Sequence, residues 1–418
     1  MTLNLKPALR FAEFGTNSWK KVKLADFLIE HKGGAPLKPT DFTSKFGCEV
    51  VPKKAIGPNG KLLLDLEVPT YCTQEFFSSF AKSVIDKGYL VTTLRDLVPT
   101  GPTIGYIVEF DNEHSYILAQ GVYGFKINET SLSRSFLIQY SNTQKYRKLM
   151  NRIMVGSTQV HVRNNDFFHF SFLLPSYKEQ KKIAGFLSSV DKKVLMLREK
   201  LSLLEKYKAG ILKKIIEKEI RFHDDDDEYF PEWRELPLNQ IAKVFDGTHM
   251  TPNYVEKGVP FYSVEHLTRN NFSKTKFIAE NVFEKECKRV TLEKGDILMT
   301  RIGDVGTIKY IDWNVRASFY VSLALIKIKP EHDPMFFSQY MKSSYFQREL
   351  HKRTIHVAFP KKINLGEIGG CLVKIPSHAE QIVISRYLSQ VDKKLELVSQ
   401  QIEQTETFKK GLLQQMFV

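Results

Sequence analysis

The stretch that decides the fold runs from Pro175 to Ile216 and reads PSYKEQKKIAGFLSSVDKKVLMLREKLSLLEKYKAGILKKII. The chain contains it twice, because the segment from Pro376 to Phe417 reads PSHAEQIVISRYLSQVDKKLELVSQQIEQTETFKKGLLQQMF. The two copies align without a gap, and both keep an EQ pair, a VDKK run and a K-x-G-[IL]-L ending. Such self-similarity indicates a repeated architecture before it says anything about function.

Each copy also carries a helical signal, because apolar residues recur at alternating spacings of four and three, the roughly 3.5-residue period of a coiled coil. The first seam comprises Ile183, Leu187, Val190, Val194, Leu197, Leu201, Leu204, Ile211 and Ile215, interrupted at Lys208. The second comprises Ile384, Leu388, Val391, Leu395, Val398, Ile402, Leu412 and Met416. At about 1.5 Å per residue, a helix of roughly 40 residues is about 60 Å long. Because a long segment separates the two helices, they close most easily as an antiparallel pair with a globular domain at each end.

The same heptads would also suit a coiled coil that only joins copies of the protein. However, the repetition extends beyond the helices: Arg10-Phe11 and Trp19 recur as Arg221-Phe222 and Trp233. The repeated unit is therefore a lead-in, a globular domain and a long helix, which favours pairing within one chain.

We predict an α/β or α+β chain with a pseudo-twofold internal repeat, in which two globular domains are joined by two long helices that form an antiparallel intramolecular coiled coil. The predicted boundaries are 1–174 for the lead-in and first domain, 175–220 for the first helix, 221–233 for an acidic linker and second lead-in, 234–375 for the second domain and 376–418 for the second helix. The two domains diverge far more than the helices do. That pattern suggests one scaffold that presents two different surfaces.

Composition narrows the class of protein. With 418 residues, of which 42% are hydrophobic, the chain can bury more than one core. Its formal net charge of +14 points to a polyanionic partner, either nucleic acid or an anionic membrane surface. The four cysteines form no CxxC, which argues against a zinc knuckle or a disulfide framework. Without an apolar export segment or a long apolar stretch, we expect a cytoplasmic protein with no membrane contact.

The sequence contains no recognisable set of catalytic residues. The run from Gly57 to Lys61 resembles a phosphate-binding loop only superficially, because Leu62 stands where Ser or Thr should hold Mg²⁺. Glu286-Cys287-Lys288 has a nuclease-like spacing without an upstream Pro-Asp partner, and Asp333-Pro334-Met335-Phe336 lacks the second proline of an amine methyltransferase motif. The acidic run 223–228 is expected to be a solvated linker rather than a metal site. We therefore expect no catalytic residue, no bound metal and no cofactor.

As a set, the motifs resemble the specificity (S) subunit of type I restriction-modification systems. The resemblance is carried by the E-Q to V-D-K-K cores at 179–193 and 380–394, the K-x-G-[IL]-L endings at 208–212 and 409–413, the P-E-W-x-x-x-x-L lead-in at 231–238, and, in the second domain, Gly247-Thr248, Thr251-Pro252 and the runs 258–261, 295–298 and 301–306. The first domain departs from the pattern, with Ala35-Pro36 in place of Thr-Pro and an insertion before Gly101.

The resemblance implies a DNA-binding subunit that is not itself an enzyme. Two target-recognition domains would each read one half of a bipartite, asymmetric sequence in double-stranded DNA, while the helix pair separates them and docks two methyltransferase subunits. S-adenosylmethionine would then belong to those subunits, and ATP and Mg²⁺ to further restriction (helicase-nuclease) subunits. Two alternatives remain. A non-specific nucleic-acid-binding coiled-coil scaffold would not need two unlike domains, and a self-contained nuclease or methyltransferase is disfavoured by the missing motifs.

Loops rich in hydrogen-bond donors and cations are the candidates for DNA contact, because base edges and phosphates require such groups. In the first domain we predict Lys32, Lys38, Arg95, Thr103, Ser157, Thr158, Gln159 and Arg163. In the second we predict Thr248, His249, Asn253, Tyr254, Arg301, Thr307, Lys309, Arg353 and His356. For helix pairing and subunit docking we predict Leu187, Val190, Val194, Leu197, Leu201, Leu388, Val391, Leu395, Val398 and Ile402.

Overall fold

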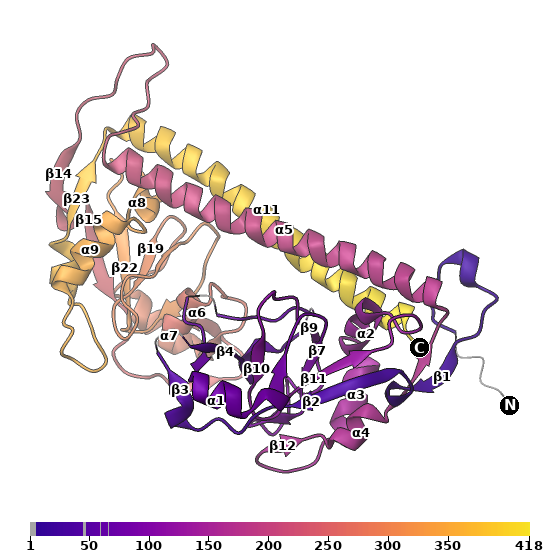
Figure 1. Cartoon of the computed structure of the whole chain (residues 1–418). Coiled ribbons are helices and arrows are strands. Elements are labelled where there is room, and N and C mark those ends of the chain that lie inside the picture. The colour runs from indigo at the N-terminus through magenta and orange to yellow at the C-terminus, as the bar shows by residue number, and fades with distance from the viewer. Residues whose placement is uncertain (1–5, 45–46, 59, 66) are drawn as a thin grey trace. The chain divides into compact units, whose positions relative to one another are not determined.

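The computed structural model describes residues 6–44, 47–58, 60–65 and 67–418. Residues 1–5 of the predicted lead-in and Asn59 of the superficial phosphate-loop match lie outside the described residues. The chain forms two compact units, Met1–Arg198 with Gln400–Val418, and Glu199–Ser399. Each unit contains sheets, short helices and part of each of two long helices, α5 (Tyr177–Ile216) and α11 (His378–Met416) (Figure 1).

The first unit is mixed α and β. Its strands are β1 (Lys20–Lys23), β2 (Leu28–Gly33), β3 (Phe42–Thr43), β4 (Cys48–Val51), β5 (Tyr71–Cys72), β6 (Val84–Ile85), β7 (Leu90–Thr93), β8 (Arg95–Asp96), β9 (Ile107–Glu109), β10 (Tyr116–Leu118), β11 (Val122–Ile127), β12 (Val160–His161) and β13 (Ser171–Leu174). Its short helices are α1 (Gln74–Ser79), α2 (Arg134–Ser141), α3 (Gln144–Ile153) and α4 (Asn164–Phe168), with 3-10 turns at Ala12–Phe14, Leu24–Phe27, Pro39–Asp41, Lys53–Ala55 and Ala81–Ser83.

These strands form the sheets β2-β11-β7-β9 and β3-β5-β4-β10-β6, and the ribbons β1·β13 and β8·β12. The sheets are mainly antiparallel, and β4·β10 is a parallel pair. The main core lies where β7 and β11, both largely buried, meet α2, α3 and the long helices. Ser133 and Thr143 accept hydrogen bonds from backbone amides in the first turns of α2 and α3, which fixes where these helices begin.

The second unit repeats this plan with other side chains. Its strands are β14 (Arg234–Pro237), β15 (Ala242–Asp246), β16 (Tyr254–Val255), β17 (Val259–Tyr262), β18 (Lys276–Ile278), β19 (Ile297–Thr300), β20 (Ile308–Tyr310), β21 (Ser318–Phe319), β22 (Leu323–Ile328) and β23 (Leu372–Ile375). Its helices are α6 (Val264–Thr268), α7 (Glu280–Cys287), α8 (Pro334–Tyr340), α9 (Ser344–Arg353) and α10 (Leu365–Gly369), with a 3-10 turn at Leu238–Gln240. The sheet β15-β22-β19-β20 corresponds to β2-β11-β7-β9, and the ribbon β14·β23 corresponds to β1·β13.

The long helices pair antiparallel within each unit. In the first unit Asp191 of α5 meets Lys409 of α11 at 2.5 Å, and Arg198 further along α5 meets Glu406 earlier in α11 at 2.6 Å. In the second unit Lys208 of α5 meets Asp392 of α11 at 2.6 Å. The predicted antiparallel intramolecular pairing and the internal repeat are therefore confirmed.

Each globular domain starts and ends in one short ribbon. Lys20 at the start of β1 is the Cα partner of Leu174 at the end of β13, and Arg234 at the start of β14 is the partner of Ile375 at the end of β23. Each chain segment therefore returns to its starting point before it enters the next long helix.

Candidate nucleic-acid interface

The glutamate of the first EQ pair fastens the lead-in to the start of α5. Glu179 is buried, and its carboxylate accepts hydrogen bonds from Arg10 Nε at 2.7 Å and Nη2 at 2.8 Å. Trp19 Nε1 donates to the same carboxylate at 3.2 Å. The hydrogen bond to Glu179 raises the pKa of the Arg10 guanidinium.

The second unit contains the same hydrogen-bonded cluster, built from the Arg and Trp that recur in its lead-in. Glu380 accepts from Arg221 Nε at 3.3 Å and from Trp233 Nε1 at 2.9 Å. Burial raises the pKa of this carboxyl group. The recurrence of Arg and Trp in the two lead-ins thus has a structural cause.

The glutamine of each EQ pair holds the start of one short helix of its domain, α2 in the first unit and α8 in the second. Gln180 accepts from the Ser133 amide at 2.8 Å, at the start of α2, and donates to the Pro175 carbonyl at 3.0 Å. Gln381 accepts from the Asp333 amide at 2.8 Å, at the start of α8, and donates to Pro376 at 2.9 Å. Both satisfy buried backbone groups that would otherwise lack partners.

The aspartate of each VDKK run joins three elements. Asp191 pairs with Lys409 of the K-x-G-[IL]-L ending and accepts from Gln139 of α2 at 2.8 Å. In the second unit, Asp392 pairs with Lys208 and accepts from Gln339 of α8 at 2.6 Å. The seam interruptions at Lys208 and Lys409 are therefore partners of these aspartates. The motifs that carry the family resemblance hold domain to helix.

In the first unit, one group of predicted DNA contacts is exposed and gathers around the ribbon β8·β12. It comprises Arg95, Ser157, Thr158, Gln159 and Arg163. Arg95 is the Cα partner of His161, which places β8 beside the loop that leads into β12. Lys53 lies beside Gly121, as Arg95 does, and burial and the charge of Arg95 lower the pKa of its amine.

The other predicted contacts of this unit already have protein partners or lie apart. Lys32 Nζ donates to the Val84 carbonyl at 2.7 Å. Thr103 Oγ1 donates to Asp96 at 2.7 Å within a turn. Lys38 is exposed at the start of a 3-10 turn. DNA contact by these residues stays a prediction.

In the second unit, three of the predicted contacts bond to protein groups within turns and loops. Arg301 is 9% exposed, and its guanidinium donates to the carbonyls of Val321 at 2.7 Å and Ile363 at 3.2 Å. Thr307 Oγ1 donates to Asp304 at 2.6 Å. Thr248 is buried, and its backbone amide donates to the carbonyl of Phe319 in β21 at 2.9 Å. These three residues therefore stabilise the loops internally rather than offering donors at the surface.

The remaining predicted contacts of the second unit offer donors at the surface. They are His249, Asn253, Tyr254, Lys309, Arg353 and His356, of which Lys309 and Arg353 are half-buried. His249 Nε2 lies 2.6 Å from Asp246, which also pairs with Arg289. Arg353 pairs with Glu367 at 3.3 Å.

Some of the predicted seam residues share a core between the long helices: Leu187 and Val190 lie in one with Leu412 and Met416, and Leu388 in another with Leu212 and Ile215. Pairing by the other predicted seam residues stays a prediction. Leu187, Val190, Leu388, Val391 and Val398 are buried, and Val194, Leu197, Leu201, Leu395 and Ile402 are half-buried. Exposed apolar side chains on the long helices are Phe186, Leu195, Met196 and Phe408 in the first unit and Leu203, Tyr207 and Leu397 in the second. Heptad analysis missed this second set, although apolar residues beside seam positions on an otherwise charged helix are a signal for it.

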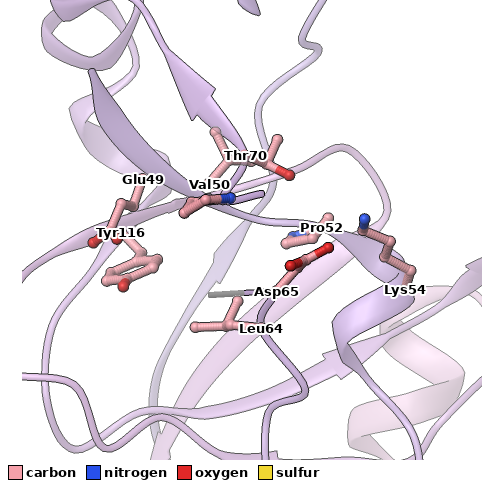
Figure 2. Close-up of a pocket in the computed structure, with 9 residues that line it drawn as sticks. Glu49, Val50, Pro52, Lys54, Leu64, Asp65, Thr70 and Tyr116 are labelled. Atoms are coloured by element: carbon pink, nitrogen blue, oxygen red, sulfur yellow. The ribbon is translucent and has the colours of Figure 1, made fainter. Parts of the chain in front are cut away.

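Two cavities lie within single units. The smaller, in the first unit, has a volume of about 30 Å³, with Glu49 beside Tyr116 on one side and Lys54 on the other (Figure 2). That is room for about one water molecule. The larger, in the second unit, measures about 320 Å³ and lies between the end of α5 and the start of α9. Lys342 lines it, and burial together with the charge of Lys208 lowers the pKa of this amine to about 8.

Within the described ranges, no group of three or more His, Cys, Asp or Glu side chains is placed to hold a metal ion. The same part of the chain contains no helix long and apolar enough to cross a membrane. The four cysteines are free thiols.

Comparison with known proteins identifies relatives of this chain and a solved structure with the same fold. Curated relatives include the "Type I restriction enzyme MjaVIII specificity subunit" of Methanocaldococcus jannaschii, 24% identical over 62% of this chain, and the "Type I restriction enzyme EcoBI specificity subunit" of Escherichia coli, 24% identical over 66% of this chain. The matched stretches span 64% and 62% of those relatives' own lengths. A crystal structure of the type I restriction-modification S subunit from M. genitalium has the same fold, with a TM-score of 0.58 at 18% identity over 99% of both chains.

The family model described as "Type I restriction modification DNA specificity domain" matches twice, at residues 17–206 and 231–407. The two matches cover more than half of the chain and include both EQ pairs and both VDKK runs. The chain belongs to the family of type I restriction-modification DNA specificity domains.

Proposed function

We propose that this chain is the sequence-specific DNA-binding subunit of a type I restriction-modification complex, and that each domain reads one half of a bipartite, asymmetric target. The observation that carries the proposal is the double family match on a repeated scaffold whose two loop sets differ. The first unit offers Arg95 and the polar run 157–159, whereas the second offers Asn253, Tyr254 and His356. Unlike donors at equivalent ends of one scaffold suit unlike base sequences.

Methyltransferase subunits dock, in this proposal, on the apolar side chains outside the seam rather than on the seam itself. The buried seam residues Leu187, Val190 and Leu388 already pack in cores that include the other long helix, so they have little surface left to offer. Met196 is 58% exposed and Phe408 is 56% exposed on the helices of the first unit, and Leu203 is 66% exposed in the second. Exposed apolar residues that cluster on otherwise charged helices are typical of a subunit interface.

The chain acts, in this proposal, without a catalytic site or cofactor of its own. S-adenosylmethionine is held by the methyltransferase subunits, and ATP and Mg²⁺ by restriction subunits. The 30 Å³ cavity is too small for any of these molecules. The 320 Å³ cavity lies between the end of α5 and the start of α9, and Lys213, Lys342 and Arg348 line it.

Methylation sequencing tests the proposal. The chain is expressed together with its cognate methyltransferase subunit in a host that lacks other adenine methylation, and the methylated positions are mapped. We expect methyladenine at one motif that consists of two unlike halves around a non-specific spacer, and none when either subunit is left out. Methylation at an uninterrupted palindrome, or turnover by the chain alone, would contradict it.

Docking is tested separately with the variants Met196→Ser and Phe408→Ser. We expect the double variant to bind the methyltransferase subunit at least roughly tenfold more weakly, because buried apolar anchors dominate interface affinity. Val68→Ser, a change at a 70% exposed apolar residue away from the long helices, is the matched control. Equal affinities of the two variants would place the docking surface elsewhere.

A further inference from the structure

The loop that follows α9 carries two fully exposed apolar side chains. Phe359 is 105% exposed and Val357 is 97% exposed, while no other large hydrophobic side chain of the described residues exceeds 81%. Pro360 follows directly and is exposed as well. A phenylalanine held entirely in water is a loss of hydrophobic stabilisation, which a binding partner would recover.

The base of this loop is fixed, so the exposed tip is held in place. Lys362 bridges to both Ile355 and Ile302, and the Gly303 amide donates to the Lys361 carbonyl at 2.8 Å. The buried guanidinium of Arg301 donates to the carbonyl of Ile363, just after the loop. Arg301 is therefore a positioning residue for the loop rather than a surface donor.

The surroundings of the tip are cationic. Lys361 and Lys362 are exposed on one side, and His356 is exposed on the other. The last turn of α9 adds His351, Lys352 and Arg353. The neighbouring acids Glu349 and Glu367 are engaged by Lys352 and Arg353. An apolar tip on a basic platform matches duplex DNA, with stacked bases inside and phosphates outside, better than it matches a protein surface.

We propose that Phe359 is a wedge that inserts between two base pairs of the half-site read by the second domain, while Lys361 and Lys362 bind the flanking phosphates. The inference rests on the proposed function and names a specificity-determining element within it. Phe and Pro are among the side chains with which proteins unstack and kink a base step. Because unstacking costs less at flexible steps, the wedge selects sequence at a position where no base edge is read.

The wedge belongs to one half of the chain only. The equivalent loop of the first unit follows α3 and carries the polar run Ser157-Thr158-Gln159. Its apolar residue Val155 is only 38% exposed. The distortion of the DNA is therefore confined to one half-site.

The test uses the full chain with its methyltransferase subunit and duplexes that carry the methylated motif. 2-Aminopurine, whose fluorescence rises on unstacking, replaces adenines one at a time in both half-sites, and the adenine that is methylated is left out. We expect increased fluorescence at one step in the half-site of the second domain and none in the other half-site. Phe359→Ala removes the signal and weakens specific binding roughly tenfold to a hundredfold.

Control variants separate a wedge from a merely structural residue. Phe359→Leu keeps an apolar wedge and retains most of the signal, whereas Val68→Ala, a change at a 70% exposed apolar residue of the first unit, leaves the fluorescence unchanged. If Phe359→Ala binds and unstacks the motif like wild type, the wedge is overturned while specific recognition stands. If Phe359→Ala instead weakens only methyltransferase binding, the tip docks protein and the inference is equally overturned. Absence of any specific motif for the wild type would refute the proposed function itself.

Discussion

Buried Glu179 has three hydrogen-bond donors arranged around its carboxylate. Arg10 gives it two hydrogen bonds and Trp19 a third, which compensates for the water that the carboxylate has lost. Removal of one partner from such a pair costs more than the pair contributes, since the other charge stays buried.

The variant Glu179→Gln should therefore destabilise the first unit by about 3–5 kcal/mol, because the guanidinium of Arg10, only 9% exposed, loses its counter-charge. Urea denaturation followed by hydrogen exchange of α2 and the start of α5 measures this loss in the first unit. Glu205→Gln, on an exposed face of α5, is the control and should change stability by less than about 0.5 kcal/mol. If both variants unfold at the same urea concentration, the hydrogen bonds to Glu179 contribute nothing to stability.

Lys342 should react with amine reagents at a lower pH than the surface lysines. The residue is exposed overall, but desolvation where it lines the cavity, together with the charge of Lys208, lowers its pKa to about 8. The folded chain therefore begins to lose this proton near pH 8, whereas the unfolded chain keeps it until near pH 10.5. The folded state then binds fewer protons than the unfolded state between these values, so this group makes stability rise with pH across that window.

Competitive acetylation read by mass spectrometry should give half-maximal labelling of Lys342 at about pH 8. Lys352, 71% exposed in its side chain, is the internal comparison and should label at a clearly higher pH. Equal labelling curves for the two amines would show that the cavity does not shift the titration of Lys342.

At the scale of elements, the helices and their seam follow from the sequence, because heptad spacing is a local pattern. The hydrogen-bond partners of the motif residues cannot be predicted from the sequence in this way. Arg10 and Glu179 are far apart in the chain, and one sequence gives no contact information to join them. The recurrence of Arg10 as Arg221 was visible, however, and indicates a shared structural role once the repeat is known.

Lys409 and Asp191 should behave as one unit in the first helix pair. The variant Lys409→Ala should cost about 1–3 kcal/mol, because the partly buried Asp191 would keep only its bond to Gln139. The exchange Asp191→Lys with Lys409→Asp restores opposite charges and should recover part of that loss. A double-mutant cycle in urea measures the coupling.

Lys410→Ala, at the exposed neighbour of Lys409, is the control and should leave stability nearly unchanged. A charge exchange no more stable than the worse single variant would mean that Asp191 depends on Gln139 and not on the ion pair.

For the whole molecule, the order of lead-in, domain and helix is legible from the repeat, but the loop surfaces are not. The sequence predicts Arg301 and Thr307 as DNA contacts because both carry hydrogen-bond donors in a loop. The structure engages both with protein groups, which sequence alone cannot distinguish from an exposed donor. Conversely, the exposure of Phe359 cannot be predicted, because an isolated apolar residue in a sequence gives no sign of whether it is buried.

The domains should be exchangeable as modules, since each begins and ends in one ribbon. Arg234 and Ile375 are Cα partners, so a segment from 234 to 375 taken from another specificity subunit of the family can replace this one without moving α11 or the lead-in. Glu380 and its partners Arg221 and Trp233 all lie outside the exchanged segment. Gln381 and Asp392 bond to Asp333 and Gln339 inside it, so the donor should keep the equivalents of these two residues. Methylome sequencing of the exchanged chain should show one half of the motif altered and the other half and the spacer unchanged. Exchange of 20–174, whose ends Lys20 and Leu174 also pair, should alter the opposite half. If either exchange changed the bases of both halves, the two domains would not read DNA independently, and the repeat would have to act as one composite surface.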